Sequence, residues 1–159
     1  MSVEERIEEL GYRLGDPPPP LGRYVRCVVV DGLAFTAGHG PFDELGEVTV
    51  RGQVGGELTL EEGQEAARRA IVACLASLRS AVGSLDRVER IVKLLAFVNC
   101  TPGFTATSSV VDGASELLVH AFGDTGIHAR AAIGTTVLPG GIPVEIELIA
   151  KVPELDQDR

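Results

Sequence analysis

The chain has 159 residues, which is long enough for a single domain with its own hydrophobic core. Hydrophobic residues make up 45% of it and charged residues 23%, as is typical of a globular protein, and the net charge of −9 disfavours binding to nucleic-acid phosphates. No apolar run approaches the roughly 20 residues of a membrane-spanning helix, and the acidic N-terminus lacks a signal-peptide pattern. We therefore expect a soluble, cytoplasmic protein with no nucleic-acid or membrane partner.

The first 22 residues are predicted to form a short helix and an extended proline segment that lead into the domain. Residues 2–11 have the composition of a short charged helix, and the sequence GDPPPPLG at 15–22 favours an extended polyproline conformation. This segment could bind a proline-recognition module, but a rigid connection into the first strand is the simpler interpretation. We divide the chain into this lead-in (1–22), one domain (23–153) and a tail (154–159).

Residues 23–38 predict a β-hairpin. Asp31-Gly32 lies between the apolar runs YVRCVVV and LAFTAG, and Asp-Gly between such runs favours a two-residue hairpin turn. With this turn, Tyr24 would lie opposite His39 at the open end of the hairpin.

The middle of the chain predicts two amphipathic helices around a buried strand. A capping box at Thr59–Glu62 starts the first helix, over 60–82, and Gly83 ends it. The nearly continuous apolar run at 90–99 predicts a strand buried on both faces. A second apolar stripe predicts a helix over 104–122.

The last part of the chain predicts two strands, 128–136 and 143–152, joined as a hairpin by a Pro-Gly-Gly turn. Symmetric pairing about this turn would place Arg130 opposite residue 149. The full order is β-β-α-β-α-β-β, and the economical arrangement is an α+β fold in which two helices cover one face of a mixed sheet.

Neither a metal site nor a disulfide framework is predicted. The three cysteines include no C-x-x-C pair, and the three histidines include no H-x-x-x-H or H-x-H spacing. The glycine-rich loop at 38–58 matches no phosphate-binding motif. We therefore expect no metal and no cofactor.

Arg130 is a lone cation in an apolar strand. Ala132 and Gly134 share its face by the strand period of two, which leaves room beside the guanidinium. Such an arginine requires an anion, and its planar fork can bind a carboxylate through two hydrogen bonds. That anion could be a ligand, or an internal partner such as Glu145 or Glu147.

Glu145 and Glu147 lie on one face of the last strand by the same period. One or both could simply face water. Alternatively, a carboxylate next to a bound electrophile could orient or deprotonate a water molecule.

Together these residues resemble the RidA/YjgF family. The pieces G-x-Y-V, F-T-A-G-H, H-A-R-A-A and P-V-E-I-E occur in the family's order over about residues 20–152. The resemblance implies a chorismate-mutase-like fold, a homotrimer with ligand pockets between subunits, and no metal or cofactor. It also implies hydrolysis of reactive 2-imino or enamine acids to 2-keto acids and ammonia.

The resemblance implies a role for several residues of this chain. Arg130 corresponds to the arginine that binds the substrate carboxylate, and Glu145 to the glutamate that positions the hydrolytic water. Tyr24 corresponds to the aromatic pocket wall and Gly38 to a glycine that lines the pocket. His39, beside Gly38, would either assist proton transfer at the pocket rim or play a plain packing role.

Three positions depart from the family pattern. Ala37 replaces a frequent serine before the pocket glycine, Ala132 replaces a cysteine two residues after the arginine, and Asp112 stands for a frequent asparagine in the second helix. Imine hydrolysis requires no thiol, but a carboxylate at 112 would repel an anionic substrate. A second hypothesis is therefore a non-catalytic trimer that binds a small carboxylate and regulates a partner. Endoribonuclease activity, an older label of the family, is disfavoured by the acidic charge.

Overall fold

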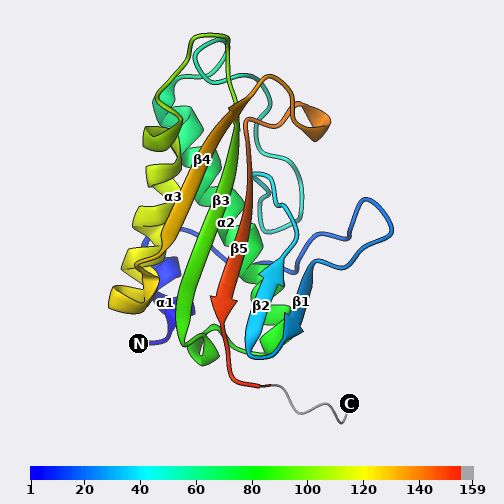
Figure 1. Ribbon diagram of the computed structural model, residues 1–159, viewed down its shortest axis with the longest axis vertical. Coiled ribbons are helices and arrows are strands. Elements are labelled where there is room, and N and C mark those ends of the chain that lie inside the picture. The colour runs from blue at the N-terminus through cyan, green and yellow to red at the C-terminus, as the bar shows by residue number, and fades with distance from the viewer. Residues whose placement is uncertain (155–159) are drawn as a thin grey trace.

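The protein, described here over residues 1–154 of a computed structural model, has an α+β fold in which helices cover one face of a five-stranded mixed sheet (Figure 1). Its α-helices and strands, in chain order, are α1 (Val3–Glu9), β1 (Cys27–Val30), β2 (Leu33–Thr36), α2 (Leu60–Val82), β3 (Arg90–Asn99), α3 (Thr107–Phe122), β4 (Ala129–Thr135) and β5 (Val144–Lys151). The predicted class and order of elements are confirmed. The predicted tail at 154–159 lies outside the described residues except for Glu154.

The strand order corrects one prediction. The sheet runs β1-β2-β5-β3-β4, so β3 lies between β4 and β5, parallel to β4 and antiparallel to β5. The last two strands therefore do not form a hairpin, and Arg130 lies opposite Leu94 of β3 instead of residue 149. The connection over 136–143 is long enough to cross the end of β3, which leaves the most apolar strand in the protected interior of the sheet.

The local signals at the first hairpin and at α2 form as predicted. Asp31 and Gly32 both have positive φ, 49° and 72°, as the two-residue hairpin turn requires. The Thr59 hydroxyl accepts a hydrogen bond from the Glu62 N–H at 3.2 Å, and the Glu62 carboxylate accepts one from the Thr59 N–H at 2.7 Å. Reciprocal capping of this kind fixes the start of α2 without help from tertiary contacts.

The core lies between the sheet and the helices. Alternate residues of β5 point into it, whereas Glu145 and Glu147 between them point to the other face. The residues on the apolar stripe of α2 are all buried: Ala67, Ala70, Ile71, Cys74, Leu75, Leu78 and Val82. Each fully buried Leu or Ile side chain contributes about 1.5–3 kcal/mol, so this layer fixes which face of every strand is left open.

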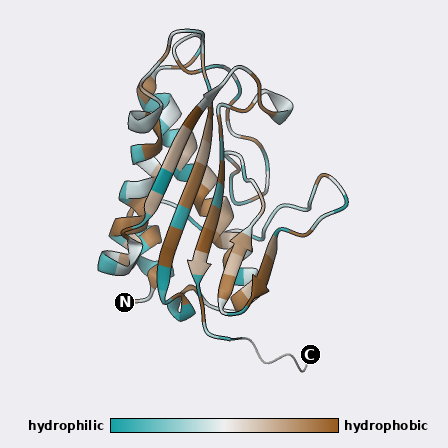
Figure 2. Cartoon of the chain, viewed as in Figure 1, coloured by the Kyte–Doolittle hydropathy of each residue, from teal (hydrophilic) through white to brown (hydrophobic). Residues whose placement is uncertain are grey.

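None of the helices formed by residues 1–154 covers the other face of the sheet (Figure 1). Its apolar side chains are partly exposed, with Val28 50%, Phe35 38% and Ile133 47% accessible. Figure 2 shows that hydrophobic residues dominate the strands and that a few hydrophilic residues interrupt them. Exposed large apolar side chains that share one face of a sheet are typical of an interaction face.

No helix within residues 1–154 combines the length and the apolar character that crossing a membrane requires.

Candidate functional site

The structure separates the predicted site residues into two groups on opposite faces of the sheet. Arg130, Ala132 and Asp112 lie on the helix side, where β4 meets α3. Glu145 and Gly38 lie on the open side, with Tyr24 beside them near the start of β1. In the first group the arginine is already paired with the Asp112 carboxylate. In the second group the Glu145 carboxylate is a candidate proton acceptor.

Arg130 is held by side chains and backbone of α3. One terminal nitrogen, Nη1, donates to Asp112 Oδ1 at 2.9 Å and to Ser115 Oγ at 3.1 Å. The other, Nη2, donates to Ser108 Oγ at 2.6 Å and to the Ser108 carbonyl at 3.2 Å. Within residues 1–154 only its Nε–H has no acceptor.

The partner of Arg130 differs from the one expected of an internal ion pair. The sequence left open an internal partner such as Glu145 or Glu147, but the carboxylate that neutralises Arg130 is Asp112. The reason is the sheet order: β4 is an edge strand next to α3, whereas both glutamates lie on β5, two strands away and on the opposite face.

Ala132, two residues further along β4, packs against the core on the same face as Arg130. Its carbonyl accepts a hydrogen bond from the Thr107 hydroxyl at 3.1 Å. The methyl side chain leaves no reactive group at this position.

Glu145 is half-buried on the open face, and no donor among residues 1–154 hydrogen-bonds to its carboxylate. Burial raises the pKa of Glu145, the nearby charge of Glu147 raises it further, and the Arg26 guanidinium partly offsets both effects. An unbonded carboxylate with a raised pKa can take up and release a proton near neutral pH more readily than an ordinary glutamate.

Gly38 lies directly against this carboxylate. A Cβ at position 38 would lie 2.8 Å from Glu145 Cδ and 3.0 Å from its Oε1, which is closer than real side chains approach. The register of β2 against β5 shifts by one residue between the Phe35–Ile149 pair and the His39–Ile146 pair, so a β-bulge turns Gly38 toward Glu145.

Tyr24 and Arg26 flank the same part of the sheet. Tyr24 is 45% exposed, and the Arg26 guanidinium lies over its ring at 5.8 Å from the centroid. Arg26 also reaches the Gly38 carbonyl with Nη1 at 3.4 Å. Sequence reasoning missed Arg26, although it is a lone cation in the apolar run YVRCVVV and so carries the same signal that singled out Arg130.

His39 does not reach the pocket rim, and it is not paired with Tyr24. Its ring is fully buried between the sheet and α2, with Nδ1 2.7 Å from the Ala37 carbonyl and Nε2 2.7 Å from Ser77 Oγ. Burial lowers the pKa of His39 to about 4, with a smaller opposing effect from the Ala37 carbonyl. The packing role is therefore the one that the geometry supports, because the bulge returns residue 39 to the core.

Arg130 and Glu145 of one chain cannot contact the same small molecule. They lie opposite Leu94 and Phe97 of β3, so they are about 10 Å apart across the sheet and about 10 Å apart along it. Their side chains also point to opposite faces. A pocket that uses both residues would have to combine two subunits.

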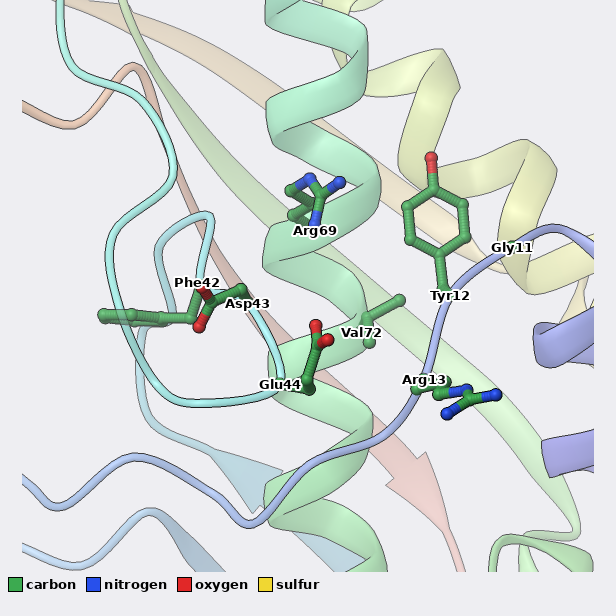
Figure 3. A pocket seen from close by; sticks show the side chains of 8 residues that line it. All are labelled: Gly11, Tyr12, Arg13, Phe42, Asp43, Glu44, Arg69 and Val72. Atoms are coloured by element: carbon green, nitrogen blue, oxygen red, sulfur yellow. The ribbon is translucent and has the colours of Figure 1, made fainter.

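No group of three His, Cys, Asp or Glu side chains within residues 1–154 could hold a metal ion. A small pocket lies away from the sheet residues, between α2 and the N-terminal segment (Figure 3). Tyr12 and Arg13 line one side of it and Asp43 and Glu44 the other, around Arg69. Its volume of about 30 Å³ suits a water molecule and excludes a metabolite.

Comparisons with known proteins agree with this architecture. The chain matches the family described as "YjgF/chorismate mutase-like, putative endoribonuclease" over residues 4–152, and it belongs to that family, which includes RidA. It is 38% identical to Protein TCP17 of Trypanosoma cruzi over 151 residues, which cover 94% of each chain.

Two solved structures indicate where the chain stands within the family. Atu1372 from Agrobacterium tumefaciens, a protein of unknown function, is 33% identical with a TM-score of 0.88, over 96% of this chain and 92% of that one. RidA from the Antarctic bacterium Psychrobacter sp. PAMC 21119 is 25% identical with a TM-score of 0.61, over 86% of this chain and 94% of that one. The chain thus lies on a branch that has diverged from RidA, in agreement with its altered residues.

Proposed function

We propose that the protein hydrolyses reactive 2-imino or enamine acids to 2-keto acids and ammonia. The observation that carries this proposal is the Glu145 carboxylate, which is half-buried, raised in pKa, free of hydrogen bonds within residues 1–154, and set against Gly38 on the open face. Membership of the family that includes RidA supports the reaction class.

Hydrolysis of an imine requires few catalytic groups from the protein. An iminium carbon is already electrophilic, so the protein has to orient the substrate and manage protons. Glu145 accepts a proton from water as the oxygen attacks the carbon. The resulting carbinolamine takes that proton on nitrogen, and the C–N bond breaks as the C=O bond forms. The hydroxyl proton passes back to Glu145 and from there to the departing ammonia, which leaves as ammonium. Neither a thiol nor a metal takes part in these steps.

A homotrimer completes the proposal. The exposed apolar face around Val28, Phe35 and Ile133 would be buried between subunits, and Arg130 of one subunit could then approach Glu145 of another. The family resemblance gives Arg130 the task of binding the substrate carboxylate. Here it could do so only through Nε–H, or after Asp112 moves away.

The pairing of Arg130 with Asp112 favours a second candidate function. In it, a trimer binds a small carboxylate and regulates a partner without turnover. Neutralisation by Asp112 weakens the attraction of Arg130 for an anionic substrate. In that case a carboxylate ligand would bind and leave chemically unchanged.

A coupled imine assay tests the proposal. A dehydratase generates 2-iminopropanoate or 2-iminobutanoate, and release of the keto acid is followed with wild type, Glu145→Gln and the neighbouring control Glu147→Gln. We expect acceleration by wild type, retention of most of it in the control, and a loss of roughly 100-fold or more in Glu145→Gln. No acceleration over buffer by the folded protein would reject the deaminase for these substrates.

RNA cleavage is tested in the same preparations because the family description names an endoribonuclease. The net charge of −9 opposes binding to RNA. We expect any RNA cleavage to be lost on further purification and to be unaffected by Glu145→Gln.

A further inference from the structure

Arg26 is a half-buried cation that forms no ion pair within residues 1–154. Its guanidinium makes three hydrogen bonds, all to backbone carbonyls: Nε to Pro18 at 2.8 Å, Nη2 to Pro19 at 2.7 Å and Nη1 to Gly38 at 3.4 Å. No carboxylate within residues 1–154 lies within ion-pair distance of it, in contrast to the Arg130–Asp112 pair. A partly desolvated guanidinium that is hydrogen-bonded only to neutral carbonyls, with Glu145 as a nearby but unbonded carboxylate, keeps donors and charge for a second anion.

The donors of Arg26 are not exhausted. A guanidinium has five N–H groups, and these bonds engage one on each nitrogen. One N–H on Nη1 and one on Nη2 remain, so a carboxylate can accept two further hydrogen bonds from this guanidinium.

Arg26 and Glu145 of one subunit both lie next to Gly38 in space. Gly38 connects them, because its carbonyl accepts from Arg26 while its α-carbon faces the Glu145 carboxylate. The Tyr24 ring lies under the guanidinium in a cation–π contact, with 5.8 Å from Cζ to the ring centroid. A small molecule that touches both Arg26 and Glu145 therefore needs no group from a second subunit.

We propose that Arg26 anchors the substrate carboxylate, the task that the family resemblance gives to Arg130. This role of Arg26 rests on the proposed deaminase function. It adds the substrate class, which is a small acid whose carboxylate binds Arg26 while its C=N carbon faces Glu145. Arg130 then serves the structure, holding α3 to β4 through Asp112, Ser108 and Ser115.

A purely structural role for Arg26 is the alternative. Its bonds to Pro18 and Pro19 fix the proline segment against β1. A structural role requires only N–H donors to the Pro18 and Pro19 carbonyls. It does not require a positive charge or unused N–H groups that could bind a carboxylate. The two roles differ in one measurable property, the affinity for a free carboxylate.

The test measures binding separately from turnover. The full-length protein is titrated with pyruvate, a 2-keto acid product, and with the neutral pyruvamide, by NMR shifts of ¹⁵N-labelled wild type, Arg26→Gln and Arg130→Gln. Arg87→Gln is the matched control, since Arg87 also donates to a backbone carbonyl, that of Val82, but lies in the turn after α2. Thermal unfolding verifies that each variant is folded.

We expect the Kd for pyruvate to rise at least tenfold in Arg26→Gln and less than twofold in Arg130→Gln and Arg87→Gln, with pyruvamide weak throughout. If Arg26→Gln does not fold, Arg26→Lys keeps the charge but not the fork, and its Kd should rise severalfold. Unchanged pyruvate affinity in the Arg26 variant, loss in Arg130→Gln alone, or no saturable binding by wild type would each overturn the anchor.

Kinetics separate this inference from the proposed function. Imine hydrolysis by wild type that Arg26→Gln leaves unchanged would reject the anchor and keep the deaminase. Pyruvate binding that requires Arg26, in a protein that does not accelerate imine decay, would keep the anchor and reject the deaminase. If both hold, Arg26→Gln should raise KM for the imino acid more than it lowers kcat.

Discussion

Gly38 and Glu145 are in such close contact that the glycine sets the position of the carboxylate. A methyl group at position 38 would lie 2.8 Å from Glu145 Cδ, so only glycine leaves the carboxylate where it is. The contact joins the bulge after β2 to β5 and forms the centre of the open-face site.

Gly38→Ala should therefore damage activity more than stability. The group that must move is the end of a flexible side chain, so we expect a loss of about 1 kcal/mol in unfolding free energy but roughly 100-fold in kcat. Gly40→Ala is the matched control, because its methyl would meet the end of the Ile142 side chain at 2.7 Å in the core. Equal loss of activity in both variants would contradict a specific role for Gly38.

Glu145→Gln should stabilise the protein at neutral pH while abolishing turnover. The folded state raises the pKa of Glu145, so the charged form is disfavoured by folding. The stability linked to this group is complete below its unfolded pKa and is lost as pH rises through the folded pKa. We expect a higher Tm than wild type at pH 7 and no difference below about pH 4. A lower Tm at pH 7 would contradict the raised pKa.

Glu147→Gln should move the acidic limb of the pH–rate profile to lower pH. The Glu147 charge is one of the causes that raise the pKa of Glu145, so its removal lets Glu145 ionise at lower pH. The measurement is kcat/KM against pH, with Glu8→Gln, an exposed change in α1, as control. An acidic limb that does not move would show that another group controls it.

His39 should make the protein less stable in acid. Its pKa is lowered to about 4 in the folded state, so the stability it contributes is present above its unfolded pKa of about 6.5 and is lost as pH falls toward 4. Over this range the loss should approach roughly 3 kcal/mol in the free energy of unfolding. Urea unfolding at several pH values measures it, and His39→Gln should flatten the pH dependence. Equal slopes in both proteins would contradict this assignment.

Asp112→Asn distinguishes the two arginines as carboxylate anchors. The Arg130–Asp112 pair is partly exposed, so its loss should cost about 1 kcal/mol or less in unfolding free energy. If Arg26 is the anchor, KM for the imino acid should change less than twofold. A several-fold fall in KM would show that the freed Arg130 binds the substrate.

The errors in the sequence prediction lie in long-range pairing. The hairpin at Asp31-Gly32 was predicted correctly because two adjacent residues dictate the turn and its register. The supposed hairpin of the last two strands was wrong because the intervening residues 136–143 do not close a tight turn. Insertion of β3 between β4 and β5 depends on burying an apolar strand from elsewhere in the chain.

The candidate site shows the same division. The sequence, with its family resemblance, singled out Glu145 and Gly38, and the structure brings these two together. It also singled out Asp112 as a carboxylate that would repel an anionic substrate. It did not predict that this carboxylate neutralises Arg130. Arg26 carries a local signal, that of a lone cation in an apolar run, but its contacts at positions 18, 19 and 38 come from segments that the sequence pattern does not connect.

By itself the sequence determined the α+β class, the ends of α2, the first hairpin and the family, since each depends on residues close together in the chain or on motifs in a fixed order. Only the tertiary structure decided which face each charged strand residue occupies and which partner it meets. The physical reason is that strand order and the bulge before His39 follow from the burial of the whole core. These two features place Arg130 against Asp112 and leave Arg26 near Glu145 with hydrogen bonds only to backbone carbonyls.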